Sequence, residues 1–154
     1  DLPQPRNELV VEGTIENGGP PYIMLTKNSP YFGGISTSDL SQYFVHDANI
    51  KVWDDNDTVQ LIEFCLNTLP VEVQIELAAS FGYSISDTDN IPNICVYTVP
   101  NIFNYFISGD TTGIFVGILN ATYYLNIEAQ GKILTSQTTI PGLIQLDPLT
   151  YKPH

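Results

Sequence analysis

Residues 113–141 read GIFVGILNATYYLNIEAQGKILTSQTTIP, and this stretch decides the fold because it contains a β-hairpin with a legible register. In the first arm, Tyr123, Leu125 and Ile127 alternate with the residues between them, so one face is apolar and the other largely polar. Gly131 closes the short connection, where a residue with positive φ is needed. The returning arm places on one face Leu134, Ser136, Thr138 and Ile140.

Earlier segments show the same strand character, rich in β-branched and aromatic residues between turn signals. In the first of them, Val11, Gly13 and Ile15 share one face, and the turn Asn17–Pro21 follows. After Pro141, the chain is expected to add an edge strand or leave the domain. The predicted strands before the hairpin are Glu8–Glu16, Tyr22–Lys27, Ile50–Asp54, Thr58–Phe64, Asn93–Val99 and Ile102–Ile107.

One segment departs from this pattern and predicts an inserted α-helix at about residues 70–81. Pro70 suits a first helical turn and Gly82 suits the position after the last one. The whole excursion covers about residues 66–92, with Cys65 just before it and Cys95 just after it. A bond between these two cysteines would contribute roughly 3–4 kcal/mol through chain entropy. The alternative is a pair of buried free thiols.

Seven or eight short strands separated by turns predict an all-β fold, an antiparallel β-sandwich with one inserted α-helix. A small barrel is the alternative architecture. A chain of 154 residues forms one domain. We divide it into a tether at 1–7, a β-sandwich at 8–149 and a tail at 150–154 that we expect to be truncated from a longer protein. Tyr123 near a strand start also fits a tyrosine corner, in which its hydroxyl bonds back to the backbone.

The charge balance excludes some partners. Five Lys and Arg against 17 Asp and Glu give a net charge of −12. Such a field repels phosphate backbones and anionic membrane surfaces, so we predict no nucleic-acid binding. No apolar run approaches the ~20 residues of a membrane-spanning helix.

The residues that carry most enzyme chemistry are sparse. The two histidines are His46 and His154, and His46 stands next to Asp47. Adjacent residues of an extended segment point apart, so this adjacency does not indicate a catalytic pair. Cys65, Cys95 and His46 show no zinc-ligand spacing. We therefore predict no catalytic residue, no metal ligand and no cofactor.

Two acidic turns, residues 54–57 and 87–90, are rich in oxygen ligands and leave calcium binding open as an alternative. Neither turn has the glycine and distant glutamate of an EF-hand loop. Acidic turns of this kind are usually solvated turns without a bound metal.

The candidate binding surface is aromatic. Tyr31, Phe32, Tyr105 and Phe106 fall in segments that look irregular or edge-like, as do Tyr43 and Phe44. Exposed aromatic side chains suit the recognition of protein or sugar, and we predict binding through the first four. The alternative is that these rings cover the open end of the sandwich as core.

Two groups of motifs resemble the Bacteroidetes outer-membrane lipoprotein family known as domain of unknown function 4249. The opening strand and its turn are similar to the family's "LVVEG-x-I" start, and the hairpin is similar to its "tYtL-x-I … Gk … TtIP" segment. Members are about twice this length or more, so this chain looks like an N-terminal module. The matching positions are Leu9–Ile15, Asn17, Gly18, Pro21, Tyr22, Ala121–Ile127, Gly131, Lys132, Thr138–Pro141 and Asp147–Leu149.

The resemblance implies an immunoglobulin-like or prealbumin-like sandwich in an exported protein. It implies a signal peptide and an N-terminal lipid anchor at the outer membrane or cell surface, often beside a TonB-dependent receptor. We therefore expect a non-enzymatic binding or assembly module that is accessory to such a receptor or another surface protein. The alternatives are a structural or adhesive spacer module and the N-terminal domain of an enzyme whose active site lies elsewhere.

Overall fold

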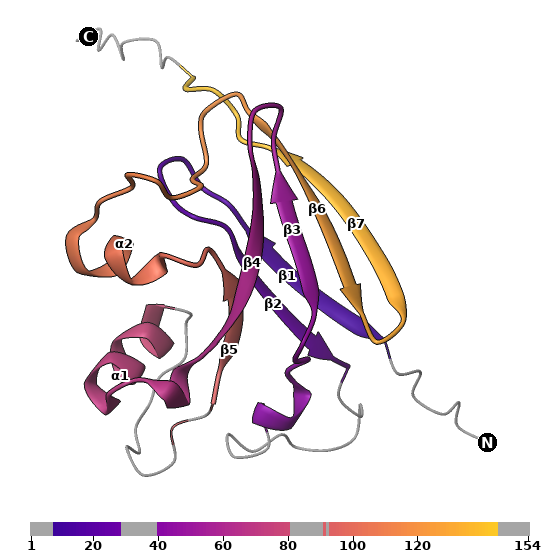
Figure 1. Ribbon diagram of the computed structural model, residues 1–154, viewed down its shortest axis with the longest axis vertical. Coiled ribbons are helices and arrows are strands. Elements are labelled where there is room, and N and C mark those ends of the chain that lie inside the picture. Colours follow the sequence, from indigo (N-terminus) through magenta and orange to yellow (C-terminus); the bar gives the residue numbers. More distant parts are fainter. Residues whose placement is uncertain (1–7, 29–39, 81–90, 92, 145–154) are drawn as a thin grey trace, which may run out of the picture.

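The computed structural model describes residues 8–28, 40–80, 91 and 93–144. Seven strands join edge to edge in one antiparallel sheet that curls like half a barrel (Figure 1). Their order is β1-β2-β5-β4-β3-β6-β7, so β1 and β7 are the two edges. The strands are β1 (Leu9–Thr14), β2 (Tyr22–Lys27), β3 (Asn49–Trp53), β4 (Thr58–Cys65), β5 (Cys95–Thr98), β6 (Thr122–Ala129) and β7 (Lys132–Thr139).

The predicted all-β, sandwich-like fold class is confirmed. The pairing of β4 shows how the two halves of the sheet are connected. This strand pairs with β5 on one side and with β3 on the other, so the two halves of the fold belong to one continuous sheet. Curling alone brings apolar side chains from both halves onto a common concave face. That face carries the main core of Ile23, Leu25, Val45, Ile50, Val52, Leu61, Tyr97, Val99, Ile102, Tyr123, Ile127, Ala129 and Ile140.

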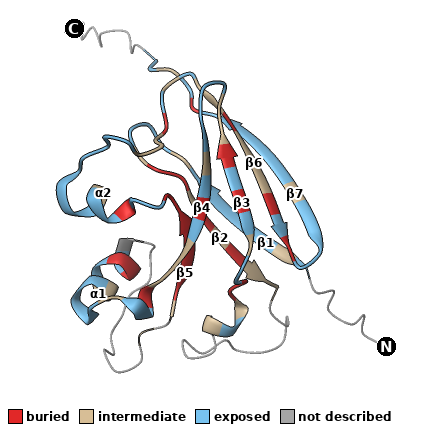
Figure 2. Ribbon diagram, in the orientation of Figure 1, coloured by how far each residue is buried: buried red, intermediate tan, exposed pale blue. Residues whose placement is uncertain are grey.

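A smaller core lies on the opposite face of the sheet. Val96 points away from its neighbour Tyr97 and joins a cluster with Leu77 and Ala78 of helix α1 (Val71–Ser80). Both faces of β5 are therefore covered, and all four of its residues are buried. Figure 2 shows this burial in the middle strands, whereas β7 and most of β1 are exposed.

The helices agree with the prediction in one case and contradict it in the other. Helix α1 lies within the predicted residues 70–81. The predicted strand Ile102–Ile107 is wrong, because Ile102–Ser108 forms helix α2, ended by Gly109 at φ 65°. This segment is apolar at nearly every position, so its periodicity does not separate strand from helix. Neither helix, nor the 3-10 turns Leu40–Tyr43 and Leu66–Thr68, has the length and apolar character of a membrane span in the described part of the chain.

The β6–β7 hairpin follows the predicted register. Ile127 pairs with Leu134, and both Gln130 and Gly131 have positive φ, as in a two-residue turn of type I′. Tyr123 and Ile127 are buried on the concave face. The Tyr123 hydroxyl accepts a hydrogen bond from the N–H of Ile118 at 2.8 Å. It also lies 3.4 Å from the carbonyl oxygen of Val116, so the predicted tyrosine corner is confirmed.

The β1–β2 turn ties the first edge of the sheet to the segment before β6. The N–H of Gly18 donates to the carbonyl of Gly117 at 2.8 Å, and the N–H of Gly117 donates to the carbonyl of Gly19 at 2.9 Å. A Cβ on Gly117 would lie 2.2 Å from the carbonyl oxygen of Glu16, so only glycine permits this approach. The contact closes one end of the curled sheet. Residues 142–144, which follow the hairpin, are not in a strand.

Candidate functional site

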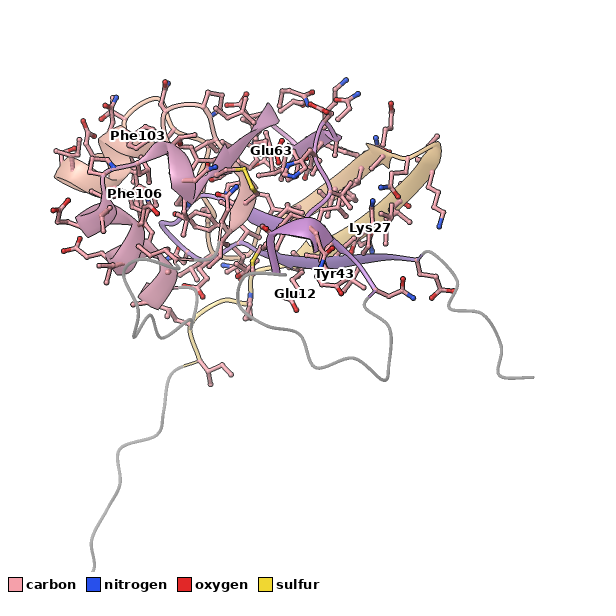
Figure 3. The ribbon with its side chains drawn as sticks, turned by 90° about the horizontal axis from the view of Figure 1, so that it is seen from below. Glu12, Lys27, Tyr43, Glu63, Phe103 and Phe106 are labelled. Atoms are coloured by element: carbon pink, nitrogen blue, oxygen red, sulfur yellow. A yellow bond between two sulfur atoms is a disulfide. The ribbon has the colours of Figure 1, made fainter. Side chains whose placement is uncertain are left out.

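The predicted aromatic surface is only partly described. Tyr31 and Phe32 lie outside the described residues. Tyr105 and Phe106 are neighbours in α2, with ring centroids 6.0 Å apart. Tyr105 packs against the main core, whereas Phe106 is 41% exposed. Figure 3 shows Phe106 beside Phe103, which makes an edge contact with Phe64 of β4.

A groove of about 540 Å³ runs over the concave face between the two edge strands. Its floor is apolar and comes from the middle of the sheet, including Ile23, Val52 and Ile127. Its walls come from β1 with the turn after it and from β7. The complete lining is Leu9, Val11, Gly13, Thr14, Ile15, Pro21, Ile23, Val52, Tyr123, Tyr124, Leu125, Ile127, Leu134, Thr135, Ser136, Gln137 and Thr138.

Among the described residues, the sheet ends at β1 and β7 and does not close into a barrel, so the groove is open. Val11 pairs with buried Leu25 and points into the groove, yet it is 36% exposed. Ser136 and Thr138 face the groove from β7 and are exposed as well. An edge strand of this kind presents unpaired backbone donors and acceptors and is a template for another strand. The groove therefore combines an apolar floor with backbone groups at its rims.

The charge beside the groove is negative. Glu8, Glu12 and Glu16 lie along β1 and its two ends, and all three are exposed. The whole chain has a net charge of −12. This acidic edge therefore favours a ligand that carries positive charge.

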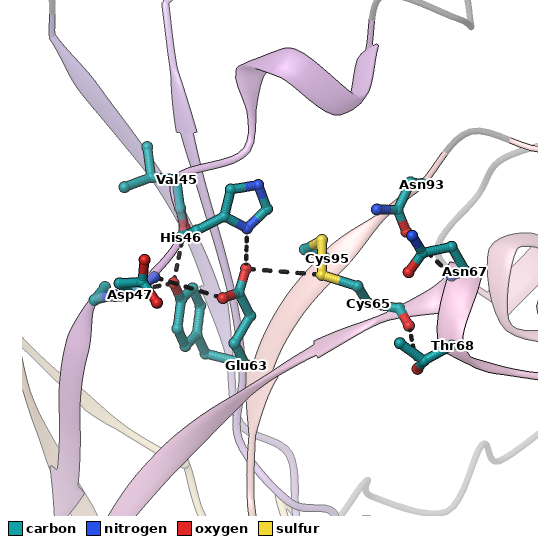
Figure 4. Close-up of a disulfide and its surroundings, with 11 residues drawn as sticks. Val45, His46, Asp47, Glu63, Cys65, Asn67, Thr68, Asn93 and Cys95 are labelled. Carbon is teal, nitrogen blue, oxygen red and sulfur yellow. Dashed lines mark hydrogen bonds and ion pairs between the residues drawn. A yellow bond between two sulfur atoms is a disulfide. The ribbon is translucent and has the colours of Figure 1, made fainter.

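A second cluster lies where the segment Val45–Ala48 crosses the sheet (Figure 4). The His46 Nδ1 contacts the Glu63 Oε1. Cys65 and Cys95, which are paired directly across β4 and β5, form a disulfide. The Cys65 sulfur lies 3.7 Å from the same Glu63 oxygen. The nearest ligand atoms of all four residues lie within 4.8 Å of one another.

Tyr97 fixes the segment that carries His46. Its hydroxyl donates to the carbonyl of Val45 at 2.7 Å and accepts from the N–H of Ala48 at 3.1 Å. Asp47, between them, has φ 58°, and its N–H lies 3.5 Å from the Glu63 carboxylate. The His46 side chain is 50% exposed and that of Glu63 22%, so solvent reaches the cluster from one side.

A family model described as a domain of unknown function (DUF4249) matches residues 1–154. The chain belongs to the DUF4249 family. No curated protein and no solved structure matches the chain. The resemblance noted in the sequence is thus confirmed at the level of the family, and the family's description assigns no activity to either site.

Two of the family motifs of this DUF4249 domain contribute to the groove. The Leu9–Ile15 motif forms β1 and one wall, and the Ala121–Ile127 motif forms β6 and part of the floor. Neither site was predicted from the sequence. The groove depends on the sheet remaining open, and the cluster draws its residues from three segments whose spacing carries no metal or catalytic pattern. The alternation of Val11, Gly13 and Ile15 on one face of the first strand is the sequence pattern from which the β1 wall of the groove could have been predicted.

The environment of Tyr97 predicts a loss of stability at alkaline pH. Burial raises the pKa of its hydroxyl to about 12; the hydrogen bond from Ala48 opposes this, and the charges of Glu63 and Asp47 add to it. The folded chain therefore holds this proton more tightly than the unfolded chain, whose tyrosines titrate near pH 10. The stabilisation of the fold that this pKa difference represents is fully present below pH 10 and is lost as the pH rises through about 12.

Between pH 9 and pH 11, we expect the titration of Tyr97 to lower the free energy of unfolding by about 1 kcal/mol. Urea unfolding at both pH values measures the loss. In Tyr97→Phe the decrease should be smaller by that amount. Part of the decrease should remain, because burial also raises the pKa of Tyr22 to about 12. Equal decreases in the two proteins would contradict the assignment.

Proposed function

We propose that this domain is a non-enzymatic binding module that takes up an extended polypeptide segment as an additional strand in the groove between β1 and β7. The observation that carries the proposal is the open concave face. The groove has an apolar floor, and each of its walls is the edge strand of one continuous sheet.

An extended segment fits this groove better than a small ligand does. Strand addition gives affinity through main-chain hydrogen bonds and specificity through pockets for alternate side chains. The rim of β7 offers small hydroxyl side chains, Ser136 and Thr138, which leave room beside the backbone. The half-buried lining residues Leu125 and Leu134 would receive the apolar side chains of every second ligand residue.

The acidic edge favours a segment with lysine or arginine on its outward face. Glu8 and Glu12 project from β1 on the side opposite the groove, at the position of an added strand's outward side chains. A segment that alternates apolar and basic residues satisfies both faces of the site.

The proposed cellular context is an exported, lipid-anchored protein at the outer membrane, with the module accessory to a TonB-dependent receptor. The resemblance to the Bacteroidetes lipoprotein family supports this context. The Cys65–Cys95 disulfide is also typical of oxidising compartments. Purification of the full-length protein from outer membranes should recover such a receptor, and recovery without one would count against the context while leaving the groove proposal intact.

Val11→Lys is expected to weaken binding of the segment at least tenfold, because it places a charge over the apolar floor. The matched control is Val73→Lys on helix α1, because this valine is 36% exposed like Val11 and does not line the groove. A photo-crosslinker at Ser136 of the full-length protein, in its own cells, would identify the segment. A synthetic peptide of that sequence would then be titrated against both variants.

Hydrogen exchange distinguishes strand addition from other binding. The peptide should slow exchange of the backbone amides of β1 or β7, which lie at the sheet edges. The proposal is rejected if Val73→Lys and Val11→Lys bind the peptide equally well, or if no edge amide gains protection. Thermal unfolding of both variants checks that each remains folded.

A further inference from the structure

The cluster beside the disulfide has the composition of a metal site once its sulfurs are reduced. We propose that reduction of the Cys65–Cys95 bond converts His46, Glu63 and the two cysteines into a four-ligand site for Zn²⁺. The disulfide and the metal would then exclude each other. This inference is independent of the groove.

The donor atoms already lie close together. One ring nitrogen of His46, a Glu63 carboxylate oxygen and the two sulfurs lie within 4.8 Å of one another. Tetrahedral zinc with nitrogen and sulfur ligands at about 2.0–2.3 Å requires ligand atoms about 3.3–3.8 Å apart. The farthest donor atoms must approach by about 1 Å, whereas the two sulfurs, and the contacting atoms of His46 and Glu63, must move apart to reach that separation. Side-chain rotation on opposed strands supplies both adjustments.

The neighbouring structure holds the ligands in place. Cys65 and Cys95 are registered opposite each other on β4 and β5, with Cα atoms 4.1 Å apart, so they stay adjacent when the bond is broken. Glu63 is on the same face of β4 two residues away. The two hydrogen bonds of the Tyr97 hydroxyl fix the backbone on either side of His46.

The donor set selects a metal. Two thiolates and one imidazole are soft or borderline ligands, which favour zinc over calcium and magnesium. Two thiolates, a neutral imidazole and a carboxylate carry three negative charges, which Zn²⁺ reduces to one. The ion would take the place of the contact between His46 and Glu63 and bind both side chains.

The chemistry balances with a dithiol as the reductant. The dithiol gives two electrons and two protons to the Cys65–Cys95 bond, which breaks into two thiols, and the dithiol becomes a disulfide. Zn²⁺ then binds both sulfurs as thiolates, and the two thiol protons pass to water. Exchange with a second disulfide, which takes up two electrons and two protons and becomes a dithiol, would re-form the Cys65–Cys95 bond and release the ion.

The test is zinc titration of the whole 154-residue chain against a chromophoric chelator, with and without a phosphine reductant. The phosphine becomes its oxide with oxygen from water and adds no thiol ligand. We expect one zinc ion per reduced chain, bound at least 100-fold more tightly than by the oxidised chain. Co²⁺ in place of zinc should give the absorption of a tetrahedral thiolate site.

Variants assign the ligands. His46→Ala and Glu63→Gln should each weaken zinc binding by the reduced chain at least tenfold, and Cys65→Ala/Cys95→Ala should abolish the effect of the reductant. Asp55→Asn, at an exposed carboxylate in the turn between β3 and β4, is the control and should bind zinc as the unchanged chain does. Equal affinity with and without reductant, or full affinity in both His46→Ala and Glu63→Gln, would overturn the proposal.

Circular dichroism covers the case in which reduction unfolds the domain. The proposal then requires that zinc restores the native spectrum of the reduced chain, because metal binding favours the folded state. A reduced chain that stays unfolded with zinc present would also overturn it.

Discussion

Ile127→Ala is expected to lower the free energy of unfolding by about 4 kcal/mol, as for other large-to-small changes at tightly packed sites. The Ile127 side chain is 1% exposed. It lies at the centre of the concave core, opposite Ile50 on β3 and Leu134 on β7. Three strands therefore lose contacts with one side chain, and the rigid sheet limits how far they can close the cavity.

Ile133→Ala provides the matched control. Ile133 is in the adjacent strand of the same hairpin but is 70% exposed and faces away from the core. Its change should stay within about 0.5 kcal/mol, because truncating a surface side chain removes little burial. Urea unfolding of the two variants and the unchanged chain measures both values. Similar losses in the two variants would contradict the described orientation of the hairpin.

Removal of the disulfide is the second large change. Cys65→Ala/Cys95→Ala should lower the free energy of unfolding by about 3–4 kcal/mol, because the cross-link restricts the unfolded chain. The two cysteines are 30 residues apart, and the loop between them contains α1. Alanine is chosen because Cys95 is buried and a serine hydroxyl would lack a defined partner there.

A reductant separates the bond's contribution from that of the side chains. Reduction of the unchanged chain in the presence of a metal chelator should reproduce most of the loss, and reduction of the double variant should change nothing further. Denaturant unfolding with and without reductant gives the four values. A double variant as stable as the unchanged chain would show that the loop around α1 is restrained by packing alone.

The strands were predictable because their side chains alternate over many residues. The β6–β7 hairpin follows the predicted faces, and β2 begins and ends at the predicted residues. Helix α1 was predictable from its proline start and helical spacing. Helix α2 was not, because Ile102–Ile107 is apolar at almost every position and Gly109, which ends the helix, fits a turn equally well.

The two candidate sites depend on long-range placement, which no local pattern records. Glu63 and His46 are 17 residues apart, and their contact requires the segment after Phe44 to cross beside β2, where Val45 donates its N–H to the carbonyl of Leu25 at 2.8 Å. The predicted absence of a zinc pattern considered spacing along the chain only. The aromatic surface suggested by Tyr105 and Phe106 divides between the core and the solvent.

The sequence by itself determined the acidic charge and, except for α2, the local elements, because alternation, turn residues and composition act over a few neighbouring positions. Tertiary structure alone decided that the strands form one curled sheet with edges at β1 and β7, and that the disulfide meets His46 and Glu63. The physical reason is that strand order and curvature come from side chains distant in sequence packing on a common core.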